Sequence, residues 1–237
     1  MKKIRRLIFF LFLIVGLIVG CSYFYLKKEY KADNYVNQFM TSTETVEVTD
    51  TDLFISFTPK QKFDTGIIFY QGAQVDENAY NPLLFKLAEK GYMVINIKFP
   101  FNLALFRTTA ALDVKKECPD VDFYLMGHSL GGAMASSCLS ENIDDFLGII
   151  LLASYSTKDI KASKVLSIYG TNDKVLNMKK YDKYKTNLPS SVKEFVIQGG
   201  NHSGFAYYGD QKGDGNLTIS RESQIKQTIN SITNFIA

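Results

Sequence analysis

Cysteine is scarce in this chain, with three in 237 residues, which excludes a scaffold held together by many disulfides. A strong excess of charge of one sign is also missing. The formal net charge is +3, and Lys2, Lys3, Arg5 and Arg6 at the extreme N-terminus account for it. The remainder is close to neutral and lacks the basic face that a nucleic-acid partner would need. There is no internal repeat or low-complexity segment, and the length suits one domain with a full core rather than two large ones.

One long run without charged residues, 7–26 (LIFFLFLIVGLIVGCSYFYL), follows the basic cluster. About 20 apolar residues span a bilayer as a helix, and basic residues before the run favour a cytoplasmic N-terminus and an exported body. We therefore expect residues 1–26 to be a membrane anchor or signal segment. The following domain is then expected on the extracytoplasmic side of a bacterial cell membrane, with the membrane as a partner through this segment.

Cys21 gives this segment a second interpretation. Residues 18–21 (IVGC) resemble the bacterial lipobox, in which the cysteine is lipidated after signal cleavage, and residues 7–19 have the length of a signal-peptide core. Residues 23–26 keep the run apolar beyond Cys21, which favours an uncleaved helix. Both interpretations tether the body of the protein to the membrane, and the sequence leaves the choice open.

The rest of the chain divides into a polar stretch and an α/β domain. Residues 27–43 are expected to be a linker or juxtamembrane helix, and 44–237 the globular domain. Within the domain, apolar runs and alternating patterns predict eight strands, and helical patterns alternate with the strands that follow the N-terminal hairpin. This alternation indicates a mostly parallel eight-stranded sheet with helices on both faces. The expected strands are a hairpin over 45–59 and strands 67–70, 92–97, 123–126, 147–153, 165–169 and 195–197; the expected helices are 83–90, 103–118, 130–139, 178–187 and 221–236.

The sequence Gly127-His128-Ser129-Leu130-Gly131-Gly132 carries the clearest chemical signal. It fits G-x-S-x-G between a predicted strand and a predicted helix of small residues, which is the context required of a nucleophile elbow. A serine on such a tight turn has an exposed hydroxyl, and the flanking glycines remove side chains where the two arms come close. The helix that follows directs free N–H groups towards the site. We therefore predict that Ser129 is a nucleophile.

A serine nucleophile needs a base and an acid that orients it. The chain has two histidines. His128 lies inside the elbow and cannot easily turn back onto its neighbour, so His202, just after the last predicted strand, is the expected base. Asp173 directly follows the strand 165–169 and is the expected acid; Asp159 and Asp182 are weaker candidates.

An oxyanion hole requires two backbone N–H donors. Leu130, the residue after the nucleophile, is expected to provide one. The other is expected from the loop after the strand 67–70, where we favour the N–H of Ala73. Gln71 and Gly72 precede it, at the position where many hydrolases carry His-Gly.

On these residues the chain resembles the serine α/β-hydrolases, and more narrowly the small bacterial α/β-hydrolases. The resemblance covers roughly residues 60–236 and is carried by segments 69–75, 127–135, 169–173 and 199–209. It implies a Ser129–Asp173–His202 triad, in the chain order that these hydrolases show, and hydrolysis of an ester-type acyl bond. The chain is also distantly similar to dienelactone hydrolases, which use a cysteine nucleophile, so Ser129 argues against that activity.

The substrate site is expected to be open. Only about eleven residues separate the strand 147–153 from the strand 165–169, too few for the lid domain that many hydrolases of this fold carry. Apolar residues in 99–106, and Phe205, Tyr207 and Tyr208 after the histidine, either line an acyl pocket or pack in the core. A small-molecule acyl substrate is expected, with amide or peptide hydrolysis and a catalytically silent binding module as alternatives.

Neither a cofactor nor a metal is expected. The segment 210–216 superficially resembles a calcium loop, but Lys212 stands where an acid is needed and no ligating glutamate follows. It is interpreted as a structural turn. Cys118 and Cys138 are expected to be free thiols rather than a disulfide, and the oligomeric state is not indicated.

Overall fold

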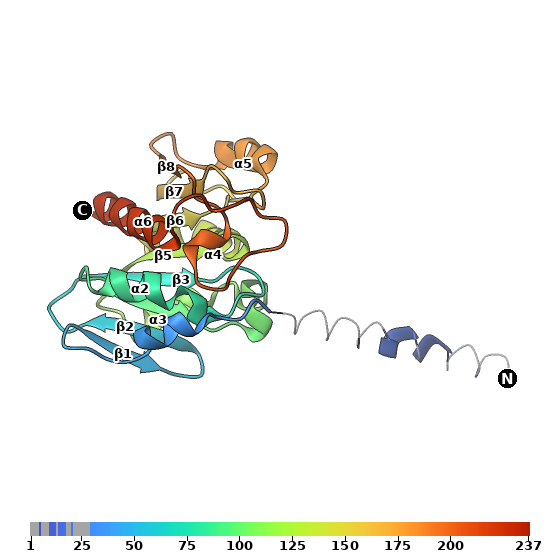
Figure 1. The fold of residues 1–237 in the computed structure, drawn as a ribbon, viewed down its shortest axis with the longest axis horizontal. Helices are drawn as coiled ribbons and strands as arrows, with labels where there is room; N and C mark the ends of the chain where they lie inside the picture. The colour runs from blue at the N-terminus through green and yellow to red at the C-terminus, as the bar shows by residue number, and fades with distance from the viewer. Residues whose placement is uncertain (1–4, 6–9, 13, 18–19, 21–28) are drawn as a thin grey trace.

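The computed structural model describes residues 5, 10–12, 14–17, 20 and 29–237. Its centre is an eight-stranded sheet in the order β1-β2-β4-β3-β5-β6-β7-β8 (Figure 1). β1 and β2 form an antiparallel hairpin, and β2 also runs antiparallel to β4. All other neighbours are parallel. The mostly parallel eight-stranded sheet predicted from the sequence is confirmed.

The bounds of the elements agree closely with the apolar patterns. The strands are β1 Val46–Asp50, β2 Phe54–Pro59, β3 Thr65–Tyr70, β4 Met93–Ile97, β5 Asp122–His128, β6 Gly148–Leu152, β7 Lys164–Gly170 and β8 Lys193–Ile197. The helices are α2 Asn81–Ala88, α3 Ala110–Glu117, α4 Leu130–Glu141, α5 Met178–Tyr184 and α6 Arg221–Ile236.

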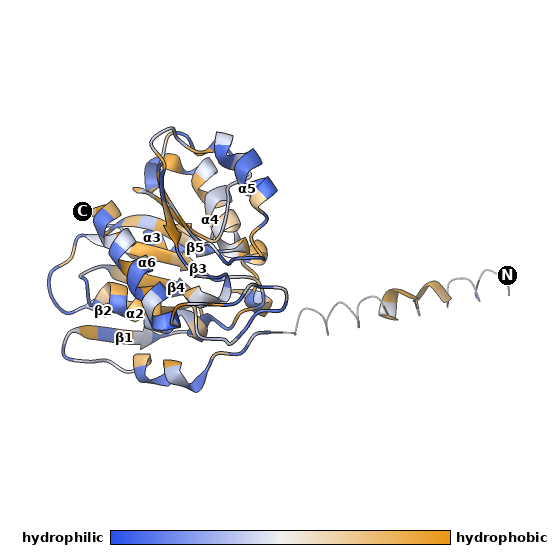
Figure 2. Cartoon of the chain, turned by 45° about the horizontal axis from the view of Figure 1, so that its top comes forward, coloured by the Kyte–Doolittle hydropathy of each residue, from blue (hydrophilic) through white to orange (hydrophobic). Residues whose placement is uncertain are grey.

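Helices cover both faces of the sheet, and the sheet's side chains divide between two cores. On β3, Ile67 and Phe69 pack in the core that α2 and α6 close, whereas Ile68 and Tyr70 pack in the core that α3 and α4 close. This division follows from the two-residue period of a strand, and it explains why β3 reads as a continuous apolar run. Figure 2 shows the apolar colour concentrated on the strands and on the inner sides of the helices.

The segment before Glu44 differs from the linker expected over 27–43. Residues Asn34–Phe39 form a short 3-10 helix, η1, and Val36 and Phe39 are buried. The Phe39 ring meets Phe85 of α2 edge-on at a centroid distance of 5.6 Å. Tyr30 pairs with Val75 in an isolated parallel bridge. Residues 29–43 are therefore part of the folded domain, because these apolar side chains cover the outer surface of α2.

The helix expected over 103–118 is divided into η4, Ala104–Arg107, and α3. The hydroxyl of Tyr70 explains the break. It donates to the carbonyl of Thr108 at 2.9 Å and accepts from the N–H of Ala111 at 3.0 Å. In a continuous helix, the Thr108 carbonyl and the Ala111 N–H would each bond to another backbone group of the helix. The buried tyrosine hydroxyl replaces those backbone hydrogen bonds, and the helix is interrupted there.

Two expectations concern segments at the margins of the fold. The predicted membrane segment lies mostly outside the described residues. Within the part that the structure describes, no helix is both long and apolar enough to span a bilayer. Between β6 and β7, residues 153–163 form neither a helix nor a strand, so this connection holds no lid domain.

Candidate active site

Ser129 lies at the turn between β5 and α4, with φ 53° and ψ −124°. This left-handed backbone is costly for a residue with a side chain, and the glycines around it make the turn possible. A Cβ on Gly127 would lie 2.5 Å from the nitrogen of Gly132, and one on Gly131 would lie 2.2 Å from the carbonyl oxygen of Tyr70. The G-x-S-x-G-G pattern is therefore required by the close approach of β5, α4 and the end of β3.

Hydrogen bonds fix this strained turn on both sides of the serine. The N–H of Ser129 donates to the carbonyl of Leu152 at 2.9 Å. The hydroxyl of Ser154 donates to the carbonyl of Ser129 at 2.7 Å. Both partners belong to β6 or its end, so the neighbouring strand holds the backbone of Ser129 in place while its side chain faces a surface pocket.

Asp173 and His202 form a buried pair at the same edge of the sheet. Their side chains are each about 1% exposed, and Asp173 Oδ2 lies 2.8 Å from His202 Nδ1. The other carboxylate oxygen accepts the N–H groups of Val175 at 2.9 Å and Leu176 at 2.8 Å. The aspartate is thereby fixed in orientation, and it favours the tautomer that carries the proton on Nδ1 and leaves the lone pair on Nε2.

Nε2 of His202 is buried and has no hydrogen-bond partner among the described residues. His202 and Ser129 line one pocket together. An unpartnered buried nitrogen costs free energy, and a general base must reach the hydroxyl whose proton it takes, which a shared pocket allows. The structure therefore brings Ser129, Asp173 and His202 together.

Gln224 of α6 positions the histidine loop, and no motif in the sequence points to this role. Its amide oxygen accepts the N–H of Asn201 at 3.0 Å, and its amide nitrogen donates to the carbonyl of Asn201 at 2.8 Å. A Cβ on Gly204 would lie 2.1 Å from the Gln224 amide oxygen. The side chain, fully buried, thus substitutes for a strand partner along the residues that flank His202.

Asp214 joins the acid loop to the base loop. One of its carboxylate oxygens accepts the N–H of Ser203 at 2.9 Å, and the other accepts the N–H of Lys174 at 3.3 Å. Ser203 follows His202, and Lys174 follows Asp173. The segment 210–216, interpreted from the sequence as a structural turn, therefore sets the spacing of the two catalytic candidates.

His128 has a structural environment that keeps it neutral. It is buried, and its Nδ1 lies 2.8 Å from the hydroxyl of Tyr80, which in turn accepts the N–H of Gly72 at 3.1 Å. Burial, and next the adjacent imidazole of His202 at a ring distance of 4.5 Å, lower the pKa of His128 well below its usual value. Burial also raises the pKa of Tyr80, so this phenol retains its proton.

The Tyr80–His128 pair bears directly on the predicted oxyanion hole. A Cβ on Gly72 would lie 2.9 Å from both Nδ1 of His128 and the hydroxyl of Tyr80. The pair therefore fixes the backbone immediately before Ala73. In the described part of the chain, no hydrogen bond from the N–H of Ala73 or of Leu130 is found, so both groups are free to donate to a ligand.

The pocket at Ser129 is small and shallow, with a volume of about 220 Å³. Its walls come from the start of α4, the end of β6 and the loop after Asp173. The residues that line it are Ser129, Leu130, Ala133, Ala153, Ser154, Tyr155, Val175, Leu176, Asn177 and His202.

Neither of the two aromatic segments considered as walls lines this pocket. Phe205 and Tyr208 are buried. Phe99 packs in the core, while Phe101 and Phe106 are exposed to solvent. The core-packing alternative is therefore correct for Phe205, Tyr208 and Phe99.

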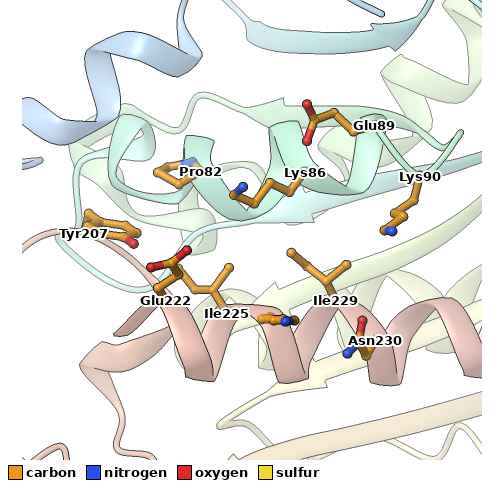
Figure 3. Close-up of a pocket in the computed structure, with 10 residues that line it drawn as sticks. Pro82, Lys86, Glu89, Lys90, Tyr207, Glu222, Ile225, Ile229 and Asn230 are labelled. Atoms are coloured by element: carbon orange, nitrogen blue, oxygen red, sulfur yellow. The ribbon is translucent and has the colours of Figure 1, made fainter. Parts of the chain in front are cut away.

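A second hollow lies between α2 and α6, away from Ser129 (Figure 3). It has a volume of about 270 Å³. Lys86, Glu89 and Lys90 line one side, and Glu222 and Ile229 the other. Its charged groups are of mixed sign, and it contains no nucleophile paired with a base. The candidate nucleophile and base instead line the smaller pocket at Ser129.

Solved structures share this fold at low sequence identity. A CIB-like hydrolase from Thermoplasma acidophilum is 19% identical, with a TM-score of 0.55, over 80% of this chain and 97% of that one. A monoacylglycerol lipase from Paleococcus ferrophilus is 12% identical, with a TM-score of 0.55, over 75% and 99%. A monoglyceride lipase from Saccharomyces cerevisiae, solved with a substrate analog, is 11% identical, with a TM-score of 0.59, over 83% and 95%. These likenesses show the fold.

Among curated proteins, no sequence matches this chain at a significant level. A family model does match, over residues 66–226, which is more than half of the chain. Its range begins in β3 and ends in α6, so it includes every residue of the candidate site described above. The chain is thus a member of the alpha/beta hydrolase family.

Proposed function

We propose that this hydrolase is a serine carboxylesterase in which Ser129, His202 and Asp173 form the catalytic triad. The observation that carries the proposal is the buried, unpartnered Nε2 of His202 in the pocket of Ser129, with Nδ1 held by Asp173 at 2.8 Å. Two structural neighbours are described as monoacylglycerol or monoglyceride lipases, and their names are consistent with ester chemistry.

The proposed reaction proceeds through an acyl-enzyme. Ser129 Oγ attacks the ester carbonyl while His202 Nε2 takes the hydroxyl proton, and the oxyanion accepts the N–H groups of Ala73 and Leu130. The bond to the leaving alcohol then breaks, and His202 gives that alcohol the proton. Water attacks the acyl-enzyme by the same route, which releases the carboxylic acid and restores Ser129. No cofactor takes part.

We further propose that residues 1–26 tether the enzyme to the membrane, with the catalytic domain on the extracytoplasmic side. The support is the uncharged run 7–26 behind four basic residues. Lipidation of Cys21 after cleavage remains the alternative form of the same tether. Mass spectrometry of the mature protein distinguishes the two, because cleavage removes the residues before Cys21 and adds lipid mass.

A fluorophosphonate probe tests the serine assignment, because it reacts with an activated serine. We expect the probe to label the wild-type protein on the peptide that holds Ser129, and Ser129→Ala to abolish labelling with the fold intact by circular dichroism. Ser154 is a second serine in the pocket, but its hydroxyl is engaged with the Ser129 carbonyl, so its peptide should stay unmodified. Equal labelling in Ser129→Ala would refute the assignment.

Hydrolysis of p-nitrophenyl esters of increasing acyl length tests the substrate class. We expect activity that depends on Ser129 and favours a limited range of acyl lengths. Labelling by the probe without any ester hydrolysis would redirect the assignment to amides. Absence of both labelling and hydrolysis would identify the protein as a catalytically silent binding module.

A further inference from the structure

A cluster of exposed apolar side chains lies at the same edge of the sheet as Ser129. Phe101, Leu105 and Phe106 are 44%, 48% and 47% exposed, and the two phenylalanine rings meet edge-on at 5.9 Å. We call these three residues the edge patch. They belong to η3, Pro100–Asn102, and η4, Ala104–Arg107, which follow the carboxyl end of β4. A group of large apolar side chains exposed to solvent indicates a site that contacts an apolar partner.

The backbone of the edge patch is held in an unfavourable conformation. Phe101 has φ 55° and Asn102 φ 54°, a left-handed region that is unfavourable for a residue with a side chain. Asn102 compensates through its contacts, because its carbonyl accepts the N–H of Gln74 at 2.8 Å and its side-chain oxygen accepts from Gln71 at 3.2 Å. The loop that presents Phe101 to solvent is thereby fastened to the loop that holds the oxyanion donor.

The N-terminal chain joins the domain at this same place. Asn102 donates to the carboxylate of Glu29 at 3.0 Å. Next in the chain, the backbone N–H of Tyr30 donates to the carbonyl of Gln74 at 2.7 Å, and the carbonyl of Tyr30 accepts the N–H of Asp76 at 3.0 Å. In Figure 1 the blue N-terminal chain reaches the domain beside the green turns that follow β4. Asn102, next to Phe101 of the edge patch, therefore hydrogen-bonds both to the oxyanion loop and to the start of the folded chain.

The length of the connection limits how far the domain can be from the uncharged run. Leu26 ends that run, and three residues later Glu29 is fastened to Asn102. Three residues span at most about 11 Å when fully extended. A bilayer that holds residues 7–26 must therefore lie close to Glu29, and the edge patch with it.

Two basic side chains on the elements that flank the edge patch are engaged in ion pairs. Lys98 bonds to Asp50 at 2.5 Å, and Arg107 to Asp113 at 3.1 Å. These two cations are therefore held by carboxylates of the domain rather than left to attract anionic headgroups. Apolar insertion of the exposed aromatic and leucine side chains at the interface is thus the interaction that this surface suits.

From the short tether and the position of the edge patch at the same edge of the sheet as Ser129, we propose that this edge rests on the membrane and that the enzyme cleaves acyl esters of membrane lipids. This inference rests on the proposed function. The acyl group leaves the bilayer at the edge patch and reaches Ser129 on the same edge. The products are a carboxylic acid, which retains the acyl chain, and the alcohol of the lipid.

The absence of tryptophan from the chain allows a direct test of contact. Phe106→Trp places a single tryptophan, which can be excited apart from the tyrosines, in the edge patch, and Leu147→Trp places one just before β6, at the opposite edge, where Leu147 is 38% exposed. The full-length variants are reconstituted in phosphatidylcholine vesicles with and without brominated acyl chains. We expect bromine to quench Phe106→Trp at least about twofold and to leave Leu147→Trp unchanged. Equal emission of Phe106→Trp in both vesicles would overturn the docking.

A second experiment tests the substrate class. Full-length protein is assayed on p-nitrophenyl acetate in solution and on dioleoylglycerol in phosphatidylcholine vesicles, with Phe101→Ser/Leu105→Ser/Phe106→Ser against Leu147→Ser. We expect the triple variant to lose about tenfold or more on the vesicle substrate, to keep its rate on the soluble ester, and Leu147→Ser to match the wild type on both.

The two assays separate failure of this inference from failure of the proposed function. A soluble-ester rate that requires Ser129, together with a vesicle rate that the triple variant does not change, overturns the inference alone. A soluble-ester rate that Ser129→Ala does not reduce overturns the proposed function. Association of the wild type into dimers that the triple variant abolishes, with no bromine quenching, would assign the edge patch to a second copy of the chain and refute docking on lipid.

Discussion

Replacing Tyr80 with phenylalanine isolates the contribution of one buried hydroxyl to the active site. The ring and its packing against Phe69, at a centroid distance of 4.7 Å, are kept. The hydroxyl is lost, and with it the partners of the Gly72 N–H and of His128 Nδ1. Each buried polar group left without a partner costs about 1–3 kcal/mol, so the loss of two partners by Tyr80→Phe should lower the free energy of unfolding by roughly 2–6 kcal/mol.

Catalysis should fall for a separate reason. Loss of an oxyanion donor costs about 10²–10³-fold in kcat, and releasing Gly72 displaces the neighbouring Ala73 only in part. We therefore expect Tyr80→Phe to lower kcat by about tenfold or more with little change in KM, because the oxyanion is stabilised only in the transition state.

Tyr70→Phe is the matched control. Tyr70 is also fully buried, and its hydroxyl also has two backbone partners, Thr108 and Ala111, so its cost in stability should be similar. Neither partner adjoins the oxyanion loop, so kcat should stay within about threefold of the wild type. Denaturant unfolding followed by circular dichroism gives the stability, and p-nitrophenyl ester kinetics give kcat. Equal losses of kcat in the two variants would refute the reasoning.

Three further variants test other parts of the site. Gln224→Met should destabilise the protein by roughly 2–4 kcal/mol and lower kcat, because Asn201 loses two buried hydrogen bonds. The control is Gln227→Met, whose amide reaches only a side-chain hydroxyl at 3.3 Å, and it should change stability and kcat little. Equal shifts of the melting temperature in the two variants would contradict this. Folding lowers the pKa of His128, so as pH falls through about 6.5 the unfolded chain takes up the proton first and the protein loses stability. His128→Phe should reduce the slope of the unfolding free energy against pH by up to about 1.4 kcal/mol per pH unit. An unchanged slope would contradict the low pKa. Gly131→Ala should abolish soluble expression or ester hydrolysis, because its Cβ would overlap the main chain of β3; a fully active variant would show that the turn can relax.

The strands and the nucleophile turn could be predicted from the sequence because each is encoded locally. The apolar run of β3 indicates a strand buried on both faces, and the glycines around Ser129 indicate a tight turn; in each case a few adjacent residues are enough for the prediction. Likewise, Asp173 and His202 follow predicted strands, and the carboxyl ends of parallel strands meet at one edge.

The supporting residues could not be predicted, because their partners lie far away in the chain. Tyr80 is 48 residues from His128, and Gln224 is 23 residues from Asn201. Neither lies in a distinctive motif, and each acts only once a helix has packed on the sheet. The role of Asp214 could not be predicted either, although its segment was correctly interpreted as a turn. Asp214 joins the loop after Asp173 to the loop after His202, and only the folded structure shows that these two loops are adjacent.

The folded segment before Glu44 was missed for a different reason. Val36 and Phe39 are isolated apolar residues among polar neighbours, and they form no periodic pattern. Their burial depends on the surface that α2 offers to them. From the sequence, a segment with so few apolar side chains is therefore predicted as a linker, and only the position of α2 shows that it is folded.

The short connection between β6 and β7 determines how an acyl-enzyme would be exposed. Residues 153–163 contain no helix or strand, and the start of this segment lines the pocket wall beside Ser129, so under the proposed mechanism the intermediate forms in contact with its surroundings, without a closing and reopening step. Any alcohol concentrated at that surface then competes with water for the acyl group. The balance between hydrolysis and transfer to another hydroxyl is therefore set by the medium at the mouth of the pocket, and it should shift towards transfer where water is scarce.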